Sequence, residues 1–178
     1  MQAVRIDSPN RDSRPPGERI TLLVLHNISL PPGRFVGDGI EQLFTNRLDP
    51  SAHPFYATIA SLRVSAHFLI RRGGALVQFV DCADRAWHAG VSSWRGRPRC
   101  NDYSIGIELE GTDDRAYTAR QYAMLAKLTR SLLRHYPIEH IVGHSDIAPG
   151  RKTDPGAAFD WRRYAHAVAR PGGARPAA

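Results

Sequence analysis

The run Ile20-Thr21-Leu22-Leu23-Val24-Leu25 is the stretch of sequence from which the fold can be worked out. It is short, apolar and bounded by polar residues, a pattern typical of a strand buried within a sheet. His26 follows it directly, and the break Pro31-Pro32-Gly33 comes soon after. The run therefore predicts a buried strand that ends at a histidine.

Three further strand patterns lie downstream. Ala66–Arg71 and Ala75–Val80 surround Gly73-Gly74, which predicts a hairpin because glycine supplies the positive φ of a tight turn. Ser104–Glu110 alternates, with isoleucine and leucine on one face and Gly106, Glu108 and Glu110 on the other. A short strand at 141–143 ends at His144.

Helical patterns separate these strands. The clearest is Thr118–Tyr136, where Thr118 and Gln121 match a capping box and Pro137 ends the pattern. We expect shorter helices at 38–48 and 159–168, an irregular lead-in at 1–19, and loops at 84–103 and 148–156. Strands that alternate with helices predict an α/β fold, a sheet covered by helices.

Length and composition limit the class of protein. The 178 residues suit one domain, which we place at 1–170, followed by a disordered tail at 171–178. The apolar content of 42% and charged content of 23% exclude a mainly disordered or fibrous chain. No stretch approaches the roughly 18 apolar residues of a membrane span, so we expect no membrane partner.

The net charge is +7, and 24 residues are Lys or Arg, of which only Lys127 and Lys152 are lysines. Such a charge suits nucleic acid, a membrane surface or an anionic substrate, but no basic stripe interleaved with aromatic residues is present. Cys82 and Cys100 form no Cys-x-x-Cys motif, which indicates reduced thiols. Residues 1–19 lack the apolar run of a secretory signal, so we expect the cytoplasm.

Two histidines and a carboxylate are the candidate metal ligands. His26 and His144 each follow a predicted strand, and Asp154 lies ten residues after His144 in an irregular loop. Two imidazoles and one carboxylate can hold a catalytic zinc ion and leave a position for water. Asp146 is a rival to Asp154 by pattern alone.

Two charged residues suit the accompanying chemistry. Lys152, close to Asp154, can stabilise the oxyanion formed when water attacks an amide. Glu108 faces away from the apolar side of its strand and can act as a general base. Glu110 shares that face and is its rival by pattern.

Five ordered motifs between residues 24 and 156 resemble the zinc N-acetylmuramoyl-L-alanine amidases, and the resemblance extends over about residues 3–168. The similarity is strongest to the cytoplasmic 1,6-anhydro-N-acetylmuramyl-L-alanine amidase branch, which serves cell-wall recycling. The motifs are VLHNISLPPG (24–33), LRVSAH (62–67), RAWHAGVSS (85–93), CNDYSIGIELEGTD (100–113) and GHSDIAPGRKTDPG (143–156).

The resemblance implies a single domain of the peptidoglycan-recognition-protein and amidase type, with a central mixed sheet flanked by helices. It implies one Zn²⁺ per chain held by His26, His144 and Asp154, with Glu108 rather than Glu110 as the acid/base group and Lys152 as the transition-state partner. Distant relatives carry a tyrosine where this chain has Ala66, which is compatible with the role of Glu108. His67 is then expected either to be structural or to support the site residues from behind.

The resemblance also implies substrate contacts and an assembly state. Asn27, Arg63, Trp87 and Arg99 match substrate-binding positions, and the two arginines suit the carboxylates of a muropeptide stem. Trp87 can either pack on a sugar or fill the core. The expected partner is an anhydro-muropeptide, and the expected state is a monomer.

Three other functions remain as alternatives. A non-catalytic muropeptide-binding module would typically lack a zinc ligand, whereas all three ligand types are present here. A nucleic-acid-binding domain is suggested by the charge alone. An amidase acting on intact peptidoglycan is disfavoured by the lack of an export signal.

Overall fold

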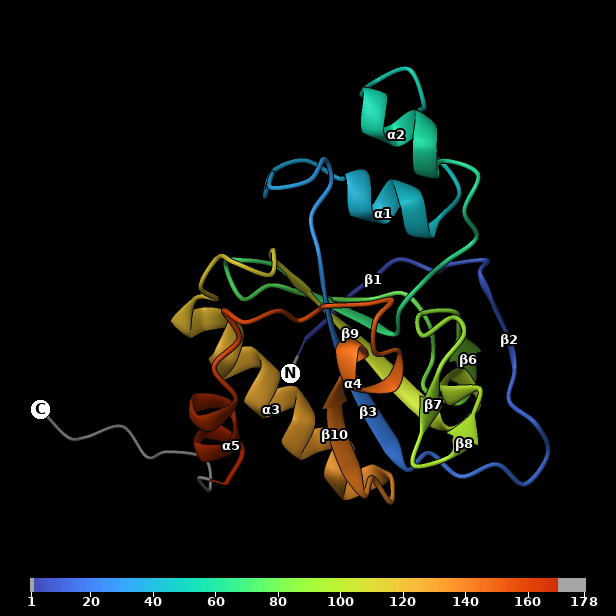
Figure 1. Cartoon of the computed structure of the whole chain (residues 1–178), viewed down its shortest axis with the longest axis vertical. Coiled ribbons are helices and arrows are strands. Elements are labelled where there is room, and N and C mark those ends of the chain that lie inside the picture. The colour runs from blue at the N-terminus through green and yellow to red at the C-terminus, as the bar shows by residue number, and fades with distance from the viewer. Residues whose placement is uncertain (1, 170–178) are drawn as a thin grey trace, which may run out of the picture.

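The computed structural model describes residues 2–169 and has a six-stranded mixed sheet at its centre (Figure 1). β4 and β5 are antiparallel, and the other neighbouring pairs are parallel. The expected α/β fold with a mixed sheet is thus confirmed. In order across the sheet, the strands are β1 (Val4–Arg5), β5 (Leu76–Gln78), β4 (Phe68–Ile70), β9 (Ser104–Glu110), β3 (Leu22–Ile28) and β10 (His140–Gly143).

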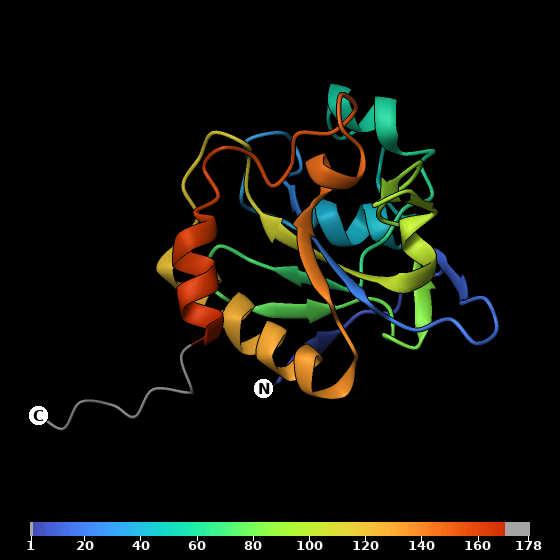
Figure 2. The ribbon, with the colours of Figure 1, turned by 60° about the horizontal axis from the view of Figure 1, so that its bottom comes forward.

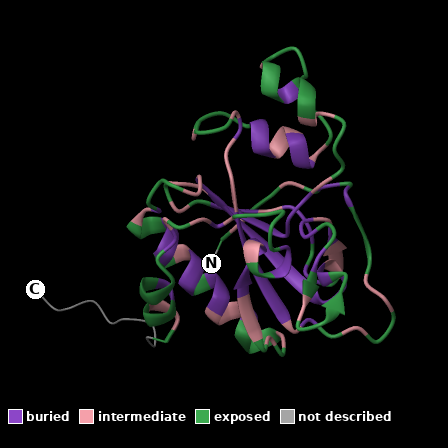
Figure 3. Cartoon of the chain, viewed as in Figure 1, coloured by how far each residue is buried: buried purple, intermediate pink, exposed green. Residues whose placement is uncertain are grey.

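Helices cover the sheet on both sides, as Figures 1 and 2 show. On one side, α3 (Ala119–His135) and α5 (Trp161–Ala169) pack on the apolar side chains of β3 and β9. On the other, α1 (Gly39–Phe44) and α2 (Pro54–Ile59) pack on β4 and β5. The central strands β4, β9 and most of β3 are buried, and the outer faces of the helices are exposed (Figure 3). Each large apolar side chain buried in this way stabilises the fold by roughly 1.5–3 kcal/mol.

The capping box predicted for the long helix is present. Thr118 Oγ1 accepts the backbone N–H of Gln121 at 3.1 Å, and Gln121 Oε1 accepts the N–H of Thr118 at 3.0 Å. The helix ends at His135, just before Pro137. The predicted hairpin is also confirmed, because β4 and β5 pair around Gly74, whose φ is +85°.

Several local predictions were wrong in detail. β3 runs two residues past His26, and the helix expected at 38–48 ends at Phe44. The final helix begins at Trp161. Two short helices were not predicted, α2 and α4 (His144–Ile147). They are too short to show a helical period in the sequence.

The segments expected to be irregular contain short strands. The lead-in carries β1 and β2 (Arg11–Ser13). The 84–103 segment carries β6 (Asp84–Ala86), β7 (Ser93–Trp94), β8 (Arg97–Pro98) and the 3-10 helix η1 (Cys100–Tyr103). β2 pairs with β6 and β7 with β8, both antiparallel. The tail predicted at 171–178 lies outside the described residues.

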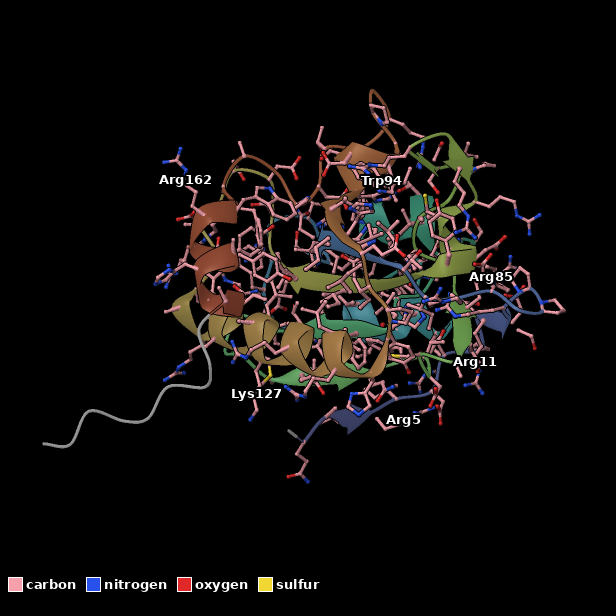
Figure 4. The ribbon with its side chains drawn as sticks, turned by 90° about the horizontal axis from the view of Figure 1, so that it is seen from below. Arg5, Arg11, Arg85, Trp94, Lys127 and Arg162 are labelled. Carbon is pink, nitrogen blue, oxygen red and sulfur yellow. The ribbon has the colours of Figure 1, made fainter. Side chains whose placement is uncertain are left out.

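Much of the positive charge is spread around the outside of the fold. Figure 4 shows Arg11 and Arg85 on one side of the molecule, Lys127 and Arg162 on the opposite side, and Arg5 at the bottom of the view. Some of these arginines are paired, since Arg5 contacts Asp7 at 2.8 Å and Arg11 contacts Asp84 at 3.3 Å. Within residues 2–169, no helix combines the length and the apolar character needed to cross a membrane.

Candidate metal centre and active site

Three neighbouring strands bring the candidate residues to one place. His26 on β3 is the register partner of Glu108 on β9, and Leu25 is the register partner of Gly143 on β10. His144 directly follows Gly143, so it lies beside His26 at the end of the neighbouring strand. Parallel partners in register point to the same face, which places these three side chains on one side of the sheet.

The two histidines and Asp154 meet at their side-chain tips. Asp154 Oδ2 lies 3.1 Å from His26 Nδ1 and 3.0 Å from His144 Nδ1, and the two Nδ1 atoms are 3.0 Å apart. His26 and His144 are 1% and 4% exposed. Among the described residues, this trio forms a group whose side chains could hold a metal ion.

The chemistry of these donors fits a cation. His144 Nε2 lies 3.2 Å from the carbonyl oxygen of Ala89, which can only accept, so that nitrogen carries the proton of the neutral ring. Its Nδ1 lone pair then faces His26 and the Asp154 carboxylate. A neutral imidazole and a carboxylate aimed at one point are ligands that zinc accepts.

The electrostatics keep the histidine neutral and the carboxylate charged. Burial lowers the pKa of His26 to about 4, against the opposing effect of Asp154. Burial alone would raise the pKa of Asp154, but its contacts with His144 and His26 outweigh burial and hold that pKa well below its ordinary value. The group therefore has a negative charge available to a divalent cation.

Glu108 lines the same cavity, and one of its carboxyl oxygens has no hydrogen-bond partner in the part of the chain that the structure describes. The cavity has a volume of about 360 Å³, and its lining includes Glu108, Lys152 and the three candidate ligands. Glu108 is 8% exposed, and its Oε2 bonds to no other group within residues 2–169. Burial raises the pKa of Glu108 well above its ordinary value, the charge of Asp154 adds to this, and Lys152 opposes it. A carboxyl group with a raised pKa in a cleft is suited to proton transfer.

The two rival carboxylates have other partners. Glu110 forms an ion pair with Arg71, and its Oε2 accepts the backbone N–H of Arg72 at 2.9 Å. Asp146 Oδ2 accepts the backbone N–H of Gly143 at 2.7 Å and so caps α4. Glu110 is therefore occupied by Arg71 and Arg72, and Asp146 is occupied by the backbone of Gly143. Neither carboxylate is among the residues that meet at Asp154.

Of the four residues expected to bind substrate, three line cavities at the site. Asn27 and Trp87 line the large cavity, and Arg63 lines a smaller one that Trp87 and Lys152 share. Trp87 is half-buried, and its indole N–H donates to Asp12 Oδ1 at 3.1 Å. Arg99 is different, because its side chain is 70% exposed, pairs with Asp102 at 3.0 Å and lines neither cavity.

Two residues of the site were missed by the sequence analysis. His88 is buried, with its Nδ1 2.9 Å from His26 Nε2. Asp113 accepts from Asn27 Nδ2 at 2.7 Å and from the hydroxyl of Thr153, beside Asp154. The expected structural role of His67 agrees with its place, since its Nδ1 accepts the N–H of Gly106 at 3.0 Å and burial lowers its pKa to about 3.

Comparison with known proteins identifies the family. Residues 16–157 match the family described as N-acetylmuramoyl-L-alanine amidase. The chain is 60% identical over 171 residues to 1,6-anhydro-N-acetylmuramyl-L-alanine amidase AmpD of Salmonella typhimurium, covering 95% of this chain and 91% of that protein. The chain belongs to the N-acetylmuramoyl-L-alanine amidase family. Membership makes it an amidase and confirms the resemblance noted in its motifs.

Solved structures of the family have the same fold. The crystal structure of a selenomethionine AmpD derivative superposes with a TM-score of 0.92 at 60% identity, covering 93% of this chain and 94% of that one. The amidase AmiD of E. coli, in complex with the substrate anhydro-N-acetylmuramic acid-L-Ala-D-gamma-Glu-L-Lys, superposes with a TM-score of 0.62 at 32% identity, covering 84% of this chain and 57% of that one. The family fold therefore extends over almost all of the described chain.

Proposed function

We propose that this amidase hydrolyses the amide bond between the lactyl group of 1,6-anhydro-N-acetylmuramic acid and L-alanine in muropeptides, as a step of peptidoglycan recycling. The observation that carries the proposal is the convergence of His26, His144 and Asp154 beside the buried carboxyl group of Glu108, whose Oε2 has no hydrogen-bond partner among the described residues. The name of the 60% identical relative and the substrate bound to AmiD support the same class of substrate.

In this proposal His26, His144 and Asp154 hold one Zn²⁺ ion. Two imidazole nitrogens and a carboxylate oxygen are the zinc ligands of many hydrolases, and they leave room for water and substrate. When bound there, zinc lowers the pKa of a water molecule and polarises a carbonyl group.

Glu108 and Lys152 carry out the proton transfer and the charge stabilisation. Glu108 lines the cavity, and its buried Oε2 has no hydrogen-bond partner within residues 2–169, so the carboxyl group is available to take the proton of the attacking water. The same carboxyl group then gives that proton to the departing amine of L-alanine. Lys152 lines the cavity and offers positive charge to the oxygen of the attacked carbonyl.

The surroundings of the site suit a sugar linked to an acidic peptide. Leu43, Phe44, Phe55 and Ile59 give one end of the large cavity an apolar wall. Arg63 and Trp87 lie toward the smaller cavity, where a guanidinium group can meet a stem carboxylate. Asn27 can orient the peptide from the end of β3, and Arg99 is a candidate contact for more distant carboxylates.

The protein is expected to act as a monomer in the cytoplasm, where Cys82 and Cys100, both buried and free, remain reduced. A nucleic-acid partner is not part of this proposal. Cell fractionation and light scattering test the location and the oligomeric state.

A comparison of substrates tests the proposed reaction. Purified anhydro-muropeptide, the corresponding reducing-end muropeptide and intact peptidoglycan are each incubated with the protein, with and without a chelator, and released stem peptides are identified by mass spectrometry. We expect chelator-sensitive release from the anhydro-muropeptide at the highest rate. Faster release from intact peptidoglycan would favour the alternative of a wall-degrading amidase, and tight binding without release would favour a recognition module.

A further inference from the structure

His88 is a buried imidazole directly behind the proposed metal centre. It follows β6 and is 9% exposed. Its Nδ1 lies 2.9 Å from His26 Nε2, and its Nε2 lies 3.2 Å from Ser104 Oγ at the start of β9. The proposed reaction gives this side chain no task, although it contacts a proposed ligand.

The proton positions along this chain of contacts follow from the chemistry of His26. A neutral imidazole has one N–H and one lone pair, and a metal binds the lone pair. The Nδ1 atom of His26 faces Asp154 and His144, so the proton must lie on its Nε2. That N–H then donates to His88 Nδ1, and His88 in turn donates its own Nε2–H to Ser104 Oγ.

The His88 ring occupies the space left by the missing side chain of Gly106 on β9. A Cβ atom built on Gly106 would overlap the ring, so a glycine at this point of β9 lets the imidazole lie against the strand. The ring stands nearly edge-on to that of His26, with an interplanar angle of 81°. The 2.9 Å contact between His88 Nδ1 and His26 Nε2 shows that a ring nitrogen of His88 is directed at His26.

The backbone next to His88 contacts the other proposed histidine ligand, His144. Asn101 Oδ1 accepts the N–H groups of His88 at 3.2 Å and Ala89 at 2.8 Å. The carbonyl oxygen of Ala89 accepts from His144 Nε2 at 3.2 Å. Two consecutive residues therefore contact the outward nitrogens of both proposed ligands.

We propose that His88 is a positioning residue that fixes the tautomer and orientation of His26, so that the Nδ1 lone pair of His26 is presented to the metal. Partners of this kind typically change metal affinity by about 10–100-fold when they are removed. The inference rests on the proposed metal site, but it concerns a residue outside the ligand set. A histidine that merely filled the core would not need an acceptor aligned with a ligand N–H.

A pair of variants separates hydrogen bonding from packing. His88→Asn places an amide oxygen close to the former Nδ1 position, whereas His88→Leu fills space without an acceptor. The zinc dissociation constant of each stripped protein is measured by competition with a chromophoric chelator, and unfolding of the metal-free proteins is followed in parallel. We expect zinc binding about 10–100-fold weaker for His88→Leu and a substantial recovery for His88→Asn.

Equal zinc affinity for His88→Leu and the wild-type protein would overturn the inference, and so would equal losses in the two variants. A wild-type protein that bound no zinc would instead contradict the proposed function. Nitrogen-15 NMR of the histidine side chains in the zinc-loaded wild-type protein gives a test that needs no variant. We expect the proton of His88 on Nε2, and a His88 proton on Nδ1 would overturn the assignment even if the variants did not fold.

Discussion

His26 and Glu108 are register partners on the adjacent parallel strands β3 and β9. Their side chains therefore leave the same face of the sheet at the same height, one toward Asp154 and one into the cavity. The sheet itself sets the spacing between a proposed metal ligand and the proposed base. Because strand positions are among the most rigid in a fold, this arrangement needs little reorganisation when substrate binds.

Removal of a proposed ligand should abolish metal binding. His26→Ala is expected to lose stoichiometric zinc and activity together, because one imidazole and one carboxylate hold zinc poorly. Metal content after dialysis and hydrolysis of anhydro-muropeptide are the measurements. The exposed His135 provides a matched control, His135→Ala, which should retain both. Full zinc content in His26→Ala would refute its role as a ligand.

Removal of the proposed base should separate catalysis from metal binding. Glu108→Gln keeps the shape of the side chain, so zinc should remain bound while kcat falls by about 10²–10⁴-fold. Glu110→Gln is the matched variant at the other glutamate on the same face of β9, and it should affect stability rather than catalysis. It breaks a buried ion pair with Arg71 and should lower the free energy of unfolding by on the order of 3 kcal/mol, yet the folded fraction should still turn over substrate. Near-normal turnover by Glu108→Gln would contradict the assignment.

Because the pKa of Glu108 is raised, we expect this residue to make the free energy of unfolding depend on pH. The folded protein holds this proton more tightly than the unfolded chain does. The contribution of Glu108 to the free energy of unfolding is therefore fully present at pH values below the ordinary carboxyl pKa. That contribution is lost as the pH rises through the folded-state pKa. Each unit by which the pKa is raised corresponds to about 1.4 kcal/mol.

Metal-free Glu108→Gln should therefore be more stable than the metal-free wild-type protein near pH 7. The difference should shrink toward acidic pH, where Glu108 is protonated in both states. Urea unfolding of the two stripped proteins from pH 4 to pH 8 measures the difference. A gap that stayed constant across this range would show that the carboxyl group is not the cause.

Asp113 is expected to hold the loop that carries Lys152 and Asp154. It accepts from Thr153, and a Cβ atom at Gly156, where φ is +81°, would overlap the Asp113 backbone. Gly156→Ala should destabilise the protein by about 1–3 kcal/mol and weaken zinc binding, because the loop must move. Gly96→Ala is the control for backbone strain, since Gly96 has the same φ but no close neighbour. If the two variants bound zinc equally well, Asp113 would not be needed to position the loop.

The sequence predicts much of this architecture because the relevant signals are local. The alternation in Ser104–Glu110 and the cap at Thr118 depend on neighbouring residues, and both match the structure. The same signals cannot distinguish Glu108 from Glu110, since both lie on one face of β9. The distinction depends on Arg71, which is distant in sequence and neutralises Glu110.

Long-range contacts also explain what the sequence analysis missed. Asp146 is excluded from the cluster by its bond to the N–H of Gly143, and pattern alone does not show this. His88 lies in a segment predicted to be a loop, where a buried imidazole has no periodic signal. Its place could have been inferred only by noticing that Gly106 leaves space on the polar face of β9. Arg99, predicted to contact substrate, pairs with Asp102 and lines neither of the two cavities, and its role stays a prediction.

We infer that one divalent ion is held by side chains from β3, the start of α4 and the loop after it. Anomalous scattering from a zinc-loaded crystal, recorded on both sides of the zinc absorption edge, tests this most directly. We expect one strong peak about 2.0–2.2 Å from His26 Nδ1, His144 Nδ1 and an Asp154 carboxylate oxygen. A peak elsewhere, or one bound through the Nε2 atoms of these histidines, would contradict it.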